Sequence, residues 1–469
     1  MAVRAAEESE RNMERVDYVS TTNACKLCKP LGACLAFRGI EGAVPMLHGS
    51  QGCATYMRRY IISHFREPMD IASSSLGEKH AVYGGGPNLK QGLKNVMTKF
   101  GAGLIGIATT CLTETIGDDV PMILREFRKE MEEAGEGADS PPLVCVSTPS
   151  YSGTHMEGFH AAVRAVVDQL CTQADPNSEP RLVNLLPGFV SPADIRHLKE
   201  IVGDFGLSCV LLPDISDTLD GPALEDYEKI PAGGTPVSDI QRMGGAAATL
   251  EFGQTLTGGR TAGTVLRDRF SVFLNQLGTP VGLRETDGFF KALEQASGLP
   301  TPEKHRLERG RLIDSYVDAH KYLFGKRAVI YGEEDLVVGL TSFLAEIGIK
   351  PVLCASGGRS GHLSSCIERV TADLVDTPPT VAEGMDFFEM EELCEGLAPD
   401  LLVGHSKGYR LARKLGVPLV RVGFPIHDRF GGQRTLHVGY RGAQMLLDRI
   451  VNAILEKAQE DSPIGYGYL

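Results

Sequence analysis

Short apolar runs recur along the chain, and most of them end at glycine, serine, threonine or cysteine. They lie at residues 44–47, 104–108, 143–147, 182–186, 208–212, 327–331, 351–355, 401–403 and 418–422. Apolar runs that lack a polar face and are bounded by turn residues are typical of strands buried on both sides. Each run is therefore predicted to be a strand of a parallel sheet.

Longer segments between these runs have the character of helices. The predicted helices cover residues 30–39, 56–65, 120–133, 155–171, 192–204, 287–296, 302–324, 335–347 and 441–457, and the whole segment 266–325 is expected to be mostly helical. Alternation of strand, loop and helix indicates an α/β fold. The alternation restarts twice, which predicts three α/β domains at residues 25–175, 181–325 and 326–469, preceded by an N-terminal arm at residues 1–24.

Length and charge narrow the class of protein. A chain of 469 residues suffices for roughly three domains of about 150 residues each. The net charge of −13 argues against a nucleic-acid partner, because phosphate binding needs a basic face. No apolar run is long enough for a membrane span, and residues 1–15 lack the apolar segment of a signal peptide. The sequence predicts a cytoplasmic protein with no membrane association.

The chain has eleven cysteines, an odd number in a long chain of predicted cytoplasmic location, which makes a disulfide framework improbable. Six are scattered beyond residue 140 and are expected to be packing thiols. The other five lie within the first 111 residues: Cys25, Cys28, Cys34, Cys53 and Cys111.

Two of these cysteines follow predicted strands. Cys53 comes after the run 44–47 and the turn 48–52, and Cys111 comes after the run 104–108. Loops at the carboxyl ends of parallel strands carry the chemistry of open α/β sheets. Together with Cys28, they suggest a metal or iron–sulfur site assembled from separate loops.

Spacing alone leaves the type of site open. A closed zinc site wants a second close pair beside Cys25-x-x-Cys28, and a thioredoxin motif wants a preceding strand. The spacing of bacterial ferredoxins is also absent. An iron–sulfur site, a zinc site, and structural or redox thiols all stay possible at this point, and a partner chain could supply missing ligands.

Seven motifs carry a resemblance to a known family. They are Cys28-Lys-Pro-Leu-Gly-Ala, His48-Gly-Ser-Gln-Gly-Cys53, His64-Phe-Arg-Glu-Pro68, Ala72-Ser-Ser-Ser75, Tyr83-Gly-Gly-Gly86, Thr110-Cys-Leu-Thr-Glu-Thr-Ile-Gly-Asp-Asp119 and Thr148-Pro-Ser-Tyr-Ser-Gly-Thr-His155. In this order they resemble the β-type subunit of the nitrogenase component 1 superfamily. The resemblance continues through Val422-Gly-Phe-Pro425 and Gly439-Tyr-Arg-Gly442.

The resemblance implies three Rossmann-like domains with parallel sheets around an interface metal-cluster site. It implies an α2β2 heterotetramer with an α-type subunit, and a P-type [8Fe-7S] or a [4Fe-4S] cluster shared between the two chains. Cys28, Cys53 and Cys111 match the cluster ligands of the β-type subunit, and Ser150 matches a serine that can bind the oxidised cluster. Cys25 and Cys34 match no ligand and are expected to pack nearby.

The function implied is electron relay. An ATP-dependent Fe protein would deliver electrons through the cluster to a larger metallocofactor held only by the partner subunit, and no catalytic residue is expected in this chain. Retention of all three cysteines and a length that is short for a molybdenum nitrogenase β subunit favour a nitrogenase-like reductase, with methylthio-alkane reductase as the best match. The alternative is a NifN-like scaffold for biosynthesis of the iron–molybdenum cofactor. A paralogue without a cluster is disfavoured by the retained thiols.

Overall fold

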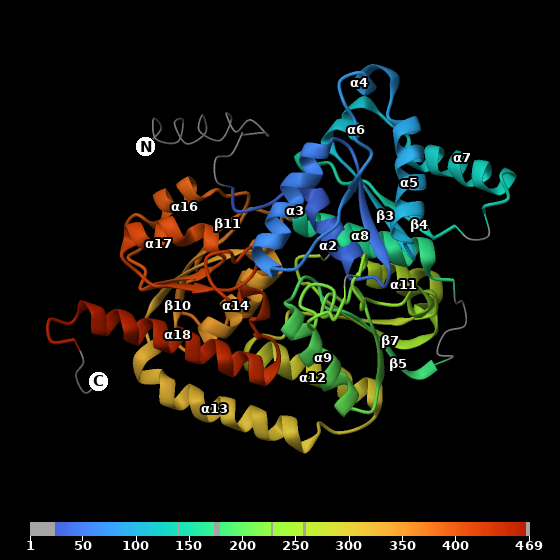
Figure 1. Cartoon of the computed structure of the whole chain (residues 1–469). Helices are drawn as coiled ribbons and strands as arrows, with labels where there is room; N and C mark the ends of the chain where they lie inside the picture. Colours follow the sequence, from blue (N-terminus) through green and yellow to red (C-terminus); the bar gives the residue numbers. More distant parts are fainter. Residues whose placement is uncertain (1–23, 138–139, 173–178, 227, 257–258, 466–469) are drawn as a thin grey trace, which may run out of the picture.

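The computed structural model describes residues 24–137, 140–172, 179–226, 228–256 and 259–465. The predicted N-terminal arm, except Ala24, lies outside the described residues. Three sheets follow one another along the chain, and every strand pair within them is parallel (Figure 1). The prediction of an α/β fold built on parallel sheets is confirmed, while the domain boundaries stay a prediction.

The first sheet has the strand order β2-β1-β3-β4. Its strands are β1 (Ala43–His48), β2 (Ala72–Ser73), β3 (Leu104–Thr109) and β4 (Leu143–Val146). The helices of this part are α2 (Lys29–Arg38), α3 (Gln51–Phe65), α4 (His80–Tyr83), α5 (Gly86–Phe100), α6 (Cys111–Ile116), α7 (Val120–Glu133) and α8 (His155–Leu170), with a 3-10 turn η1 (Ser150–Ser152). The order of the strands reverses between β1 and β3, so the loops after these two strands are neighbours.

The second sheet has the order β6-β5-β7-β8. Its strands are β5 (Glu179–Leu186), β6 (Ser208–Leu211), β7 (Ala246–Phe252) and β8 (Phe273–Leu277). Its helical segments are α9 (Pro192–Asp204), α10 (Val237–Gln241), η2 (Met243–Gly245), α11 (Ala262–Phe270), α12 (Gly282–Ser297) and α13 (Glu303–Leu323). Helix α13 runs along the lower edge of the molecule toward the third part (Figure 1).

The third sheet has the order β11-β10-β9-β12-β13. Its strands are β9 (Arg327–Gly332), β10 (Lys350–Ser356), β11 (Thr380–Ala382), β12 (Leu401–Gly404) and β13 (Leu419–Arg421). Its helical segments are α14 (Glu334–Glu346), α15 (Leu363–Thr371), α16 (Phe387–Cys394), η3 (Ser406–Gly408), α17 (Tyr409–Leu415), η4 (Gly432–Arg434) and α18 (Gly439–Asp461). Helix α18 returns from this part to pack on α13 and α12 (Figure 1).

Burial explains why the apolar runs form strands. All six residues of β1 and all six of β3 are buried, as expected for strands covered on both faces. One cover is α7, whose buried residues recur at helical spacing and join the same core as β1. Burying a side chain as large as Phe127 contributes about 1.5–3 kcal/mol.

The crossing of α2 and α8 fixes the first part around the predicted site. A Cβ on Gly32 would lie 1.6 Å from the carbonyl oxygen of His155, and a Cβ on Gly158 would lie 1.8 Å from that of Lys29. Only glycine fits at both positions, so the two helices cross with their backbones in close contact. The crossing sets the start of α2, and with it Cys28, against the start of α8.

Two predictions of secondary structure are wrong. The helix expected at residues 56–65 begins at Gln51, because Ser50 provides an extended residue at the helix start and Gly52 is tolerated in the first turn. The segment 266–325 is not mostly helical throughout, since Phe273–Leu277 forms the edge strand β8. That strand is only half-buried and carries two amides, so it lacks the apolar run that marks a central strand.

Candidate metal-cluster site

Three strands of the first sheet end close to one another and deliver the predicted site. Cys53 follows β1, Cys111 follows β3 and Ser150 follows β4. Because the sheet reverses its order between β1 and β3, this is a switch point of an open α/β sheet, where ligands bind. The order of the strands therefore explains why residues far apart in the sequence meet.

The structure brings Cys28, Cys53, Cys111 and Ser150 together. The backbone N–H of Ser150 donates to Sγ of Cys111 at 3.2 Å, and the side chain of Ser150 hydrogen-bonds to Cys28. Burial raises the pKa of the Cys28 thiol, and the nearby Cys111 and Cys53 add to that rise. All four residues are half-buried, so one side of the group stays open.

The sequence suggested that the cysteines lie in loops. In the structure their sulfur atoms lie at the starts of helices. Cys28 caps α2, Cys53 is the third residue of α3, and Cys111 is the first residue of α6. The amino end of a helix carries partial positive charge and unpaired N–H groups. Cys28 and Cys53 thus stand at the starts of helices, and thiolate is the form of cysteine that binds metal.

Hydrogen bonds to sulfur add to this arrangement. Besides the bond from Ser150, the hydroxyl of Ser50 donates to Sγ of Cys53 at 3.5 Å. Donors to ligand sulfur offset negative charge on the sulfur and help to set the reduction potential of an iron–sulfur group.

A buried network holds the loops beneath the site. His48 Nδ1 lies 2.9 Å from Oγ of Ser74, and His48 Nε2 lies 3.0 Å from Oδ2 of Asp118. The hydroxyls of Thr110 and Thr113 both donate to the carbonyl oxygen of His48, which ties the start of α6 to the end of β1. This network fixes the position of Cys111 relative to Cys53.

We expect Asp118→Asn to destabilise this part of the protein by about 1–3 kcal/mol, because the carboxylate that pairs with buried His48 and accepts from the N–H of Gly85 becomes a neutral amide. Thermal unfolding of the purified complex measures the effect. Asp119→Asn, next in sequence, is the control. Asp119 caps α7 through Met122 N, a role that asparagine also fills. Equal midpoints for the two variants would contradict the role given to Asp118.

Lys407 holds the segment before Cys28 in place, a contact that sequence analysis missed. Its ammonium group donates to the carbonyl oxygens of Ala24 at 2.9 Å and Lys26 at 3.3 Å, and so ties the segment before Cys28 to the third part. Burial lowers the pKa of Lys407, while the nearby thiols of Cys25 and Cys28 counteract that shift. The sequence offered one indication of this contact. Lys407 lies in the loop 404–407, directly after a predicted strand.

Cys25 and Cys34 lie outside the group of four. Cys34 is fully buried within α2, and burial raises its pKa. Burial also raises the pKa of Cys25 to about 12, and its Sγ lies 3.5 Å from Nε2 of His405. Both thiols are buried, and that they serve only in packing stays a prediction.

The histidines singled out in the sequence are hydrogen-bonded core residues. His64 Nδ1 accepts from the N–H of Ile426 at 2.8 Å, and His155 Nδ1 accepts from the N–H of Leu27 at 3.3 Å. His155 also lies 3.2 Å from Glu333. In the part of the chain that the structure describes, no group of three or more His, Cys, Asp or Glu is placed to hold a single metal ion.

The donor set fits an iron–sulfur cluster that a second chain completes. Thiolate is the ligand that iron–sulfur clusters use, and the four residues present an open, half-buried face. A Cβ on Gly52 would meet nothing nearer than Ser50 Oγ at 3.8 Å, so there is space beside Cys53. Gly49 and Gly85 are required by the protein itself, since a Cβ on either would collide with Thr110 or Asp118.

Residues 28–455 match a protein-family model described as nitrogenase component 1 type oxidoreductase. The chain belongs to this family. The resemblance predicted from the seven motifs is confirmed. The prediction that the chain is a subunit of a nitrogenase-family oxidoreductase is confirmed as well.

Curated relatives of this chain include nitrogenase β chains. The nitrogenase molybdenum-iron protein beta chain of Clostridium pasteurianum is 35% identical over 442 residues, which cover 94% of each chain. The nitrogenase vanadium-iron protein beta chain of Trichormus variabilis is 35% identical over 451 residues, covering 94% of this chain and 96% of the relative. The chain is thus a β-type subunit of the nitrogenase component 1 family.

A solved structure supports the same conclusion. A chain of nitrogenase Cp1 at pH 6.5 superimposes with a TM-score of 0.91 at 34% identity, covering 96% of this chain and 97% of that one. A second nitrogenase Cp1 chain, at pH 5, matches with a TM-score of 0.71 at 16% identity, a likeness of fold alone. Among the described residues, no helix is long and apolar enough to cross a membrane.

Proposed function

We propose that this chain is the electron-relaying β-type subunit of a nitrogenase-like reductase. Cys28, Cys53 and Cys111 would hold half of a P-type [8Fe-7S] cluster, with Ser150 as a further ligand when the cluster is oxidised. The observation that carries the proposal is the meeting of these four residues at the switch point of the first sheet. An iron–sulfur cluster bound there supplies reversible storage and transfer of electrons.

The residues of this chain would hold the cluster, orient it and shield it from solvent. The donors from Ser50 and Ser150 would offset negative charge on the sulfur atoms that bind the cluster. The network of His48, Ser74 and Asp118 keeps two of the three sulfur positions in register. No residue of this chain is assigned to substrate chemistry, which we place at a metallocofactor in the partner subunit.

We infer that the open face of the site receives an α-type partner in an α2β2 heterotetramer. Large apolar side chains gather near it: Val82 and Tyr83 on α4 are 78% and 84% exposed, and Tyr151 beside Ser150 is 57% exposed. Helix α4 packs on α6, which begins at Cys111 (Figure 1). Exposed apolar groups around a half-complete ligand set are typical of a surface that another chain covers. An ATP-dependent Fe protein is the proposed electron donor.

Two substrates are considered for the proposed reductase. The best match from the sequence is the C–S bond of a methylthio-alkane. The similarity to β chains of molybdenum-iron and vanadium-iron nitrogenases favours dinitrogen. The argument from chain length does not separate them, because this chain spans 94% of the Clostridium pasteurianum β chain. A NifN-like scaffold is the alternative outside catalysis.

The deciding experiment uses the complex purified anaerobically with its native α-type partner. Iron and sulfide are counted per αβ pair, and then Fe protein, ATP and reductant are added with either methylthio-ethanol or dinitrogen. Release of ethylene or methane identifies a C–S-cleaving reductase, whereas release of ammonia identifies a nitrogenase. No turnover, together with activation of a cofactor-free nitrogenase by the complex, would make the chain a scaffold subunit and overturn the proposal.

A further inference from the structure

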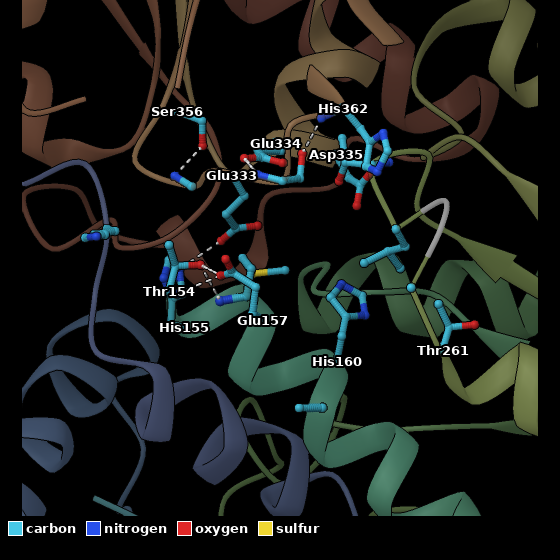
Figure 2. Close-up of a pocket in the computed structure, with 18 of the residues that line it drawn as sticks. Thr154, His155, Glu157, His160, Thr261, Glu333, Glu334, Asp335, Ser356 and His362 are labelled. Atoms are coloured by element: carbon cyan, nitrogen blue, oxygen red, sulfur yellow. Dashed lines mark hydrogen bonds and ion pairs between the residues drawn. The ribbon is translucent and has the colours of Figure 1, made fainter. Parts of the chain in front are cut away.

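A cavity of about 430 Å3 lies where the three parts of the chain meet, apart from the cysteine site. It is bounded by the start of α8, by the loops after β9 and β10, and by residues 255–256 and 259–261 (Figure 2). The volume falls in the range of about 300–1,000 Å3 that is usual for small-molecule sites. Cys28, Cys53, Cys111 and Ser150 do not line it.

The position of the cavity is that of a ligand site in α/β proteins. The loops after β7, β9 and β10 all leave the carboxyl ends of parallel strands, the edge at which open α/β sheets bind ligands. The proposed electron relay through the cysteine site gives these loops no role.

One end of the cavity is acidic. Figure 2 shows Glu333, Glu334 and Asp335 on one side and Glu157 and His160 on the other. Glu333 is only 7% exposed, and it meets His155 through Oε1 at 3.2 Å. Oε2 of Glu333 and Oε1 of Glu157 have no hydrogen-bond donor among residues 24–137, 140–172, 179–226, 228–256 and 259–465. Glu333 is buried and Glu157 is exposed, and a carboxylate oxygen on the wall of a cavity that has no protein donor can accept a hydrogen bond from an N–H group of a ligand.

Glu334 lies close to two other carboxylates, Glu157 and Glu383. Burial raises the pKa of Glu334 to about 7, and although Ser360 donates to it, the neighbouring Glu383 and Glu157 push in the same direction as burial. Lys26 adds one positive charge at the rim beside Cys25. A bound cationic group would relieve this repulsion.

The other end is basic. Arg164 lies two turns of α8 beyond Glu157, which separates their Cα atoms by about 10 Å along the helix. Within the described part of the chain, Arg164 has no ion pair or hydrogen bond, although it lines the cavity. Arg260 lines the same end and lies 3.5 Å from Asp168. Met156, Ala161 and Leu256 supply apolar wall between the two ends.

We propose that this cavity binds a small zwitterionic amino compound. Its ammonium group lies among Glu157, Glu333 and Glu334, its carboxylate lies beside Arg164, and a short alkyl chain lies against Met156, Ala161 and Leu256. A site with charge of opposite sign at its two ends selects against molecules that carry only one of the two charges, since one wall is then left without a partner.

The test is a matched series of ligands on the complex with its α-type partner. 6-Aminohexanoate carries both charges, hexylamine carries only the ammonium group, and hexanoate carries only the carboxylate. Calorimetric titration should give a Kd for 6-aminohexanoate at least about tenfold lower than for either single-charge analogue. Equal affinity for hexylamine and 6-aminohexanoate, or no saturable binding of any of the three at millimolar concentration, would overturn the proposal.

Two variants then locate the charges. Glu157→Gln should weaken 6-aminohexanoate and hexylamine and leave hexanoate unchanged. Arg164→Gln should weaken 6-aminohexanoate and hexanoate and leave hexylamine unchanged. Glu456→Gln, on the exposed side of α18, is the matched control and should change none of them. Iron content per αβ pair reports whether each variant is intact. Variants that weaken all three ligands alike, or none, would refute the assigned orientation, and the unmodified complex tests the ligand class if a variant fails to assemble.

Discussion

Replacing Cys53 by alanine is expected to abolish the cluster at the interface of the complex. The proposed site takes three thiolate ligands from this chain, and the Cys53 variant removes one of them. Neither water nor the Ser50 hydroxyl binds iron with comparable affinity. We expect loss of the iron and sulfide assigned to the interface, and loss of the redox signal of that cluster. Metal analysis and electron paramagnetic resonance of the anaerobic complex measure both.

The control for this variant is Cys34→Ala. Cys34 lies within the same part of the chain and is completely buried, but it belongs to the packing of α2 and not to the group around Ser150. Removing its sulfur costs about 1–2 kcal/mol of packing and should leave iron content unchanged. Unchanged iron in Cys53→Ala, or equal iron loss in the two variants, would remove Cys53 from the proposed ligand set.

Ser150 distinguishes a redox-dependent ligand from a permanent one. Its N–H donates to Cys111 through the backbone, which any residue at this position retains. Ser150→Ala should therefore keep the full iron content and change the spectrum of the oxidised complex. Loss of iron in the reduced complex would show that the hydroxyl is needed at all times.

The fold was largely predictable because central parallel strands are buried on both faces. The runs at 104–108 and 327–331 lie in β3 and β9, where nearly every residue is buried. β8 was missed for the opposite reason, since an edge strand with a half-exposed Asn-Gln pair carries no apolar run. The start of α3 was missed because Gly52 resembles a turn residue, although the first turn of a helix tolerates glycine.

The cysteine site was only partly predictable from spacing. Strand ends pointed to Cys53 and Cys111, but only the strand order, with β1 beside β3, explains why they meet. Cys28 was grouped with these two cysteines, although it follows no predicted strand, and its place depends on the α2–α8 crossing. The role of Lys407 depends on a contact between segments almost the whole chain apart, which no local pattern encodes.

A second large effect is expected where the second and third parts of the chain join. Asp194 on α9 is completely buried and lies 3.0 Å from Nδ1 of His437, in the segment before α18. It also accepts from the N–H groups of His437 at 2.8 Å and Val438 at 3.1 Å. Asp194→Ala should destabilise the chain by about 3–5 kcal/mol, because it leaves the buried His437 ring and two N–H groups without their acceptor.

The same pair should make stability depend on pH. Burial alone would raise the pKa of Asp194, but His437 outweighs it and holds that pKa below its usual value. Burial would lower the pKa of His437, but Asp194 outweighs it and raises that pKa. The Asp194 carboxylate stabilises the folded chain at pH values above the pKa that it has in the unfolded chain. The His437 imidazolium stabilises the folded chain at pH values below the pKa that it has in the unfolded chain. The joint contribution is complete between about pH 4 and about pH 6.5, and it falls below the first value and above the second.

Thermal midpoints of the complex across this pH range test both expectations. The unmodified complex should lose stability from pH 6 toward pH 9 more steeply than Asp194→Asn, in which the amide cannot hold His437 protonated. Asp239→Asn is the matched control, since Asp239 forms an ion pair of equal length, 3.0 Å, with Arg242 but is about one-third exposed. Such exposed pairs contribute about 0–1 kcal/mol. If Asp194→Asn and Asp239→Asn gave the same midpoints and the same pH profile, the buried pair would not be what joins α9 to the segment before α18.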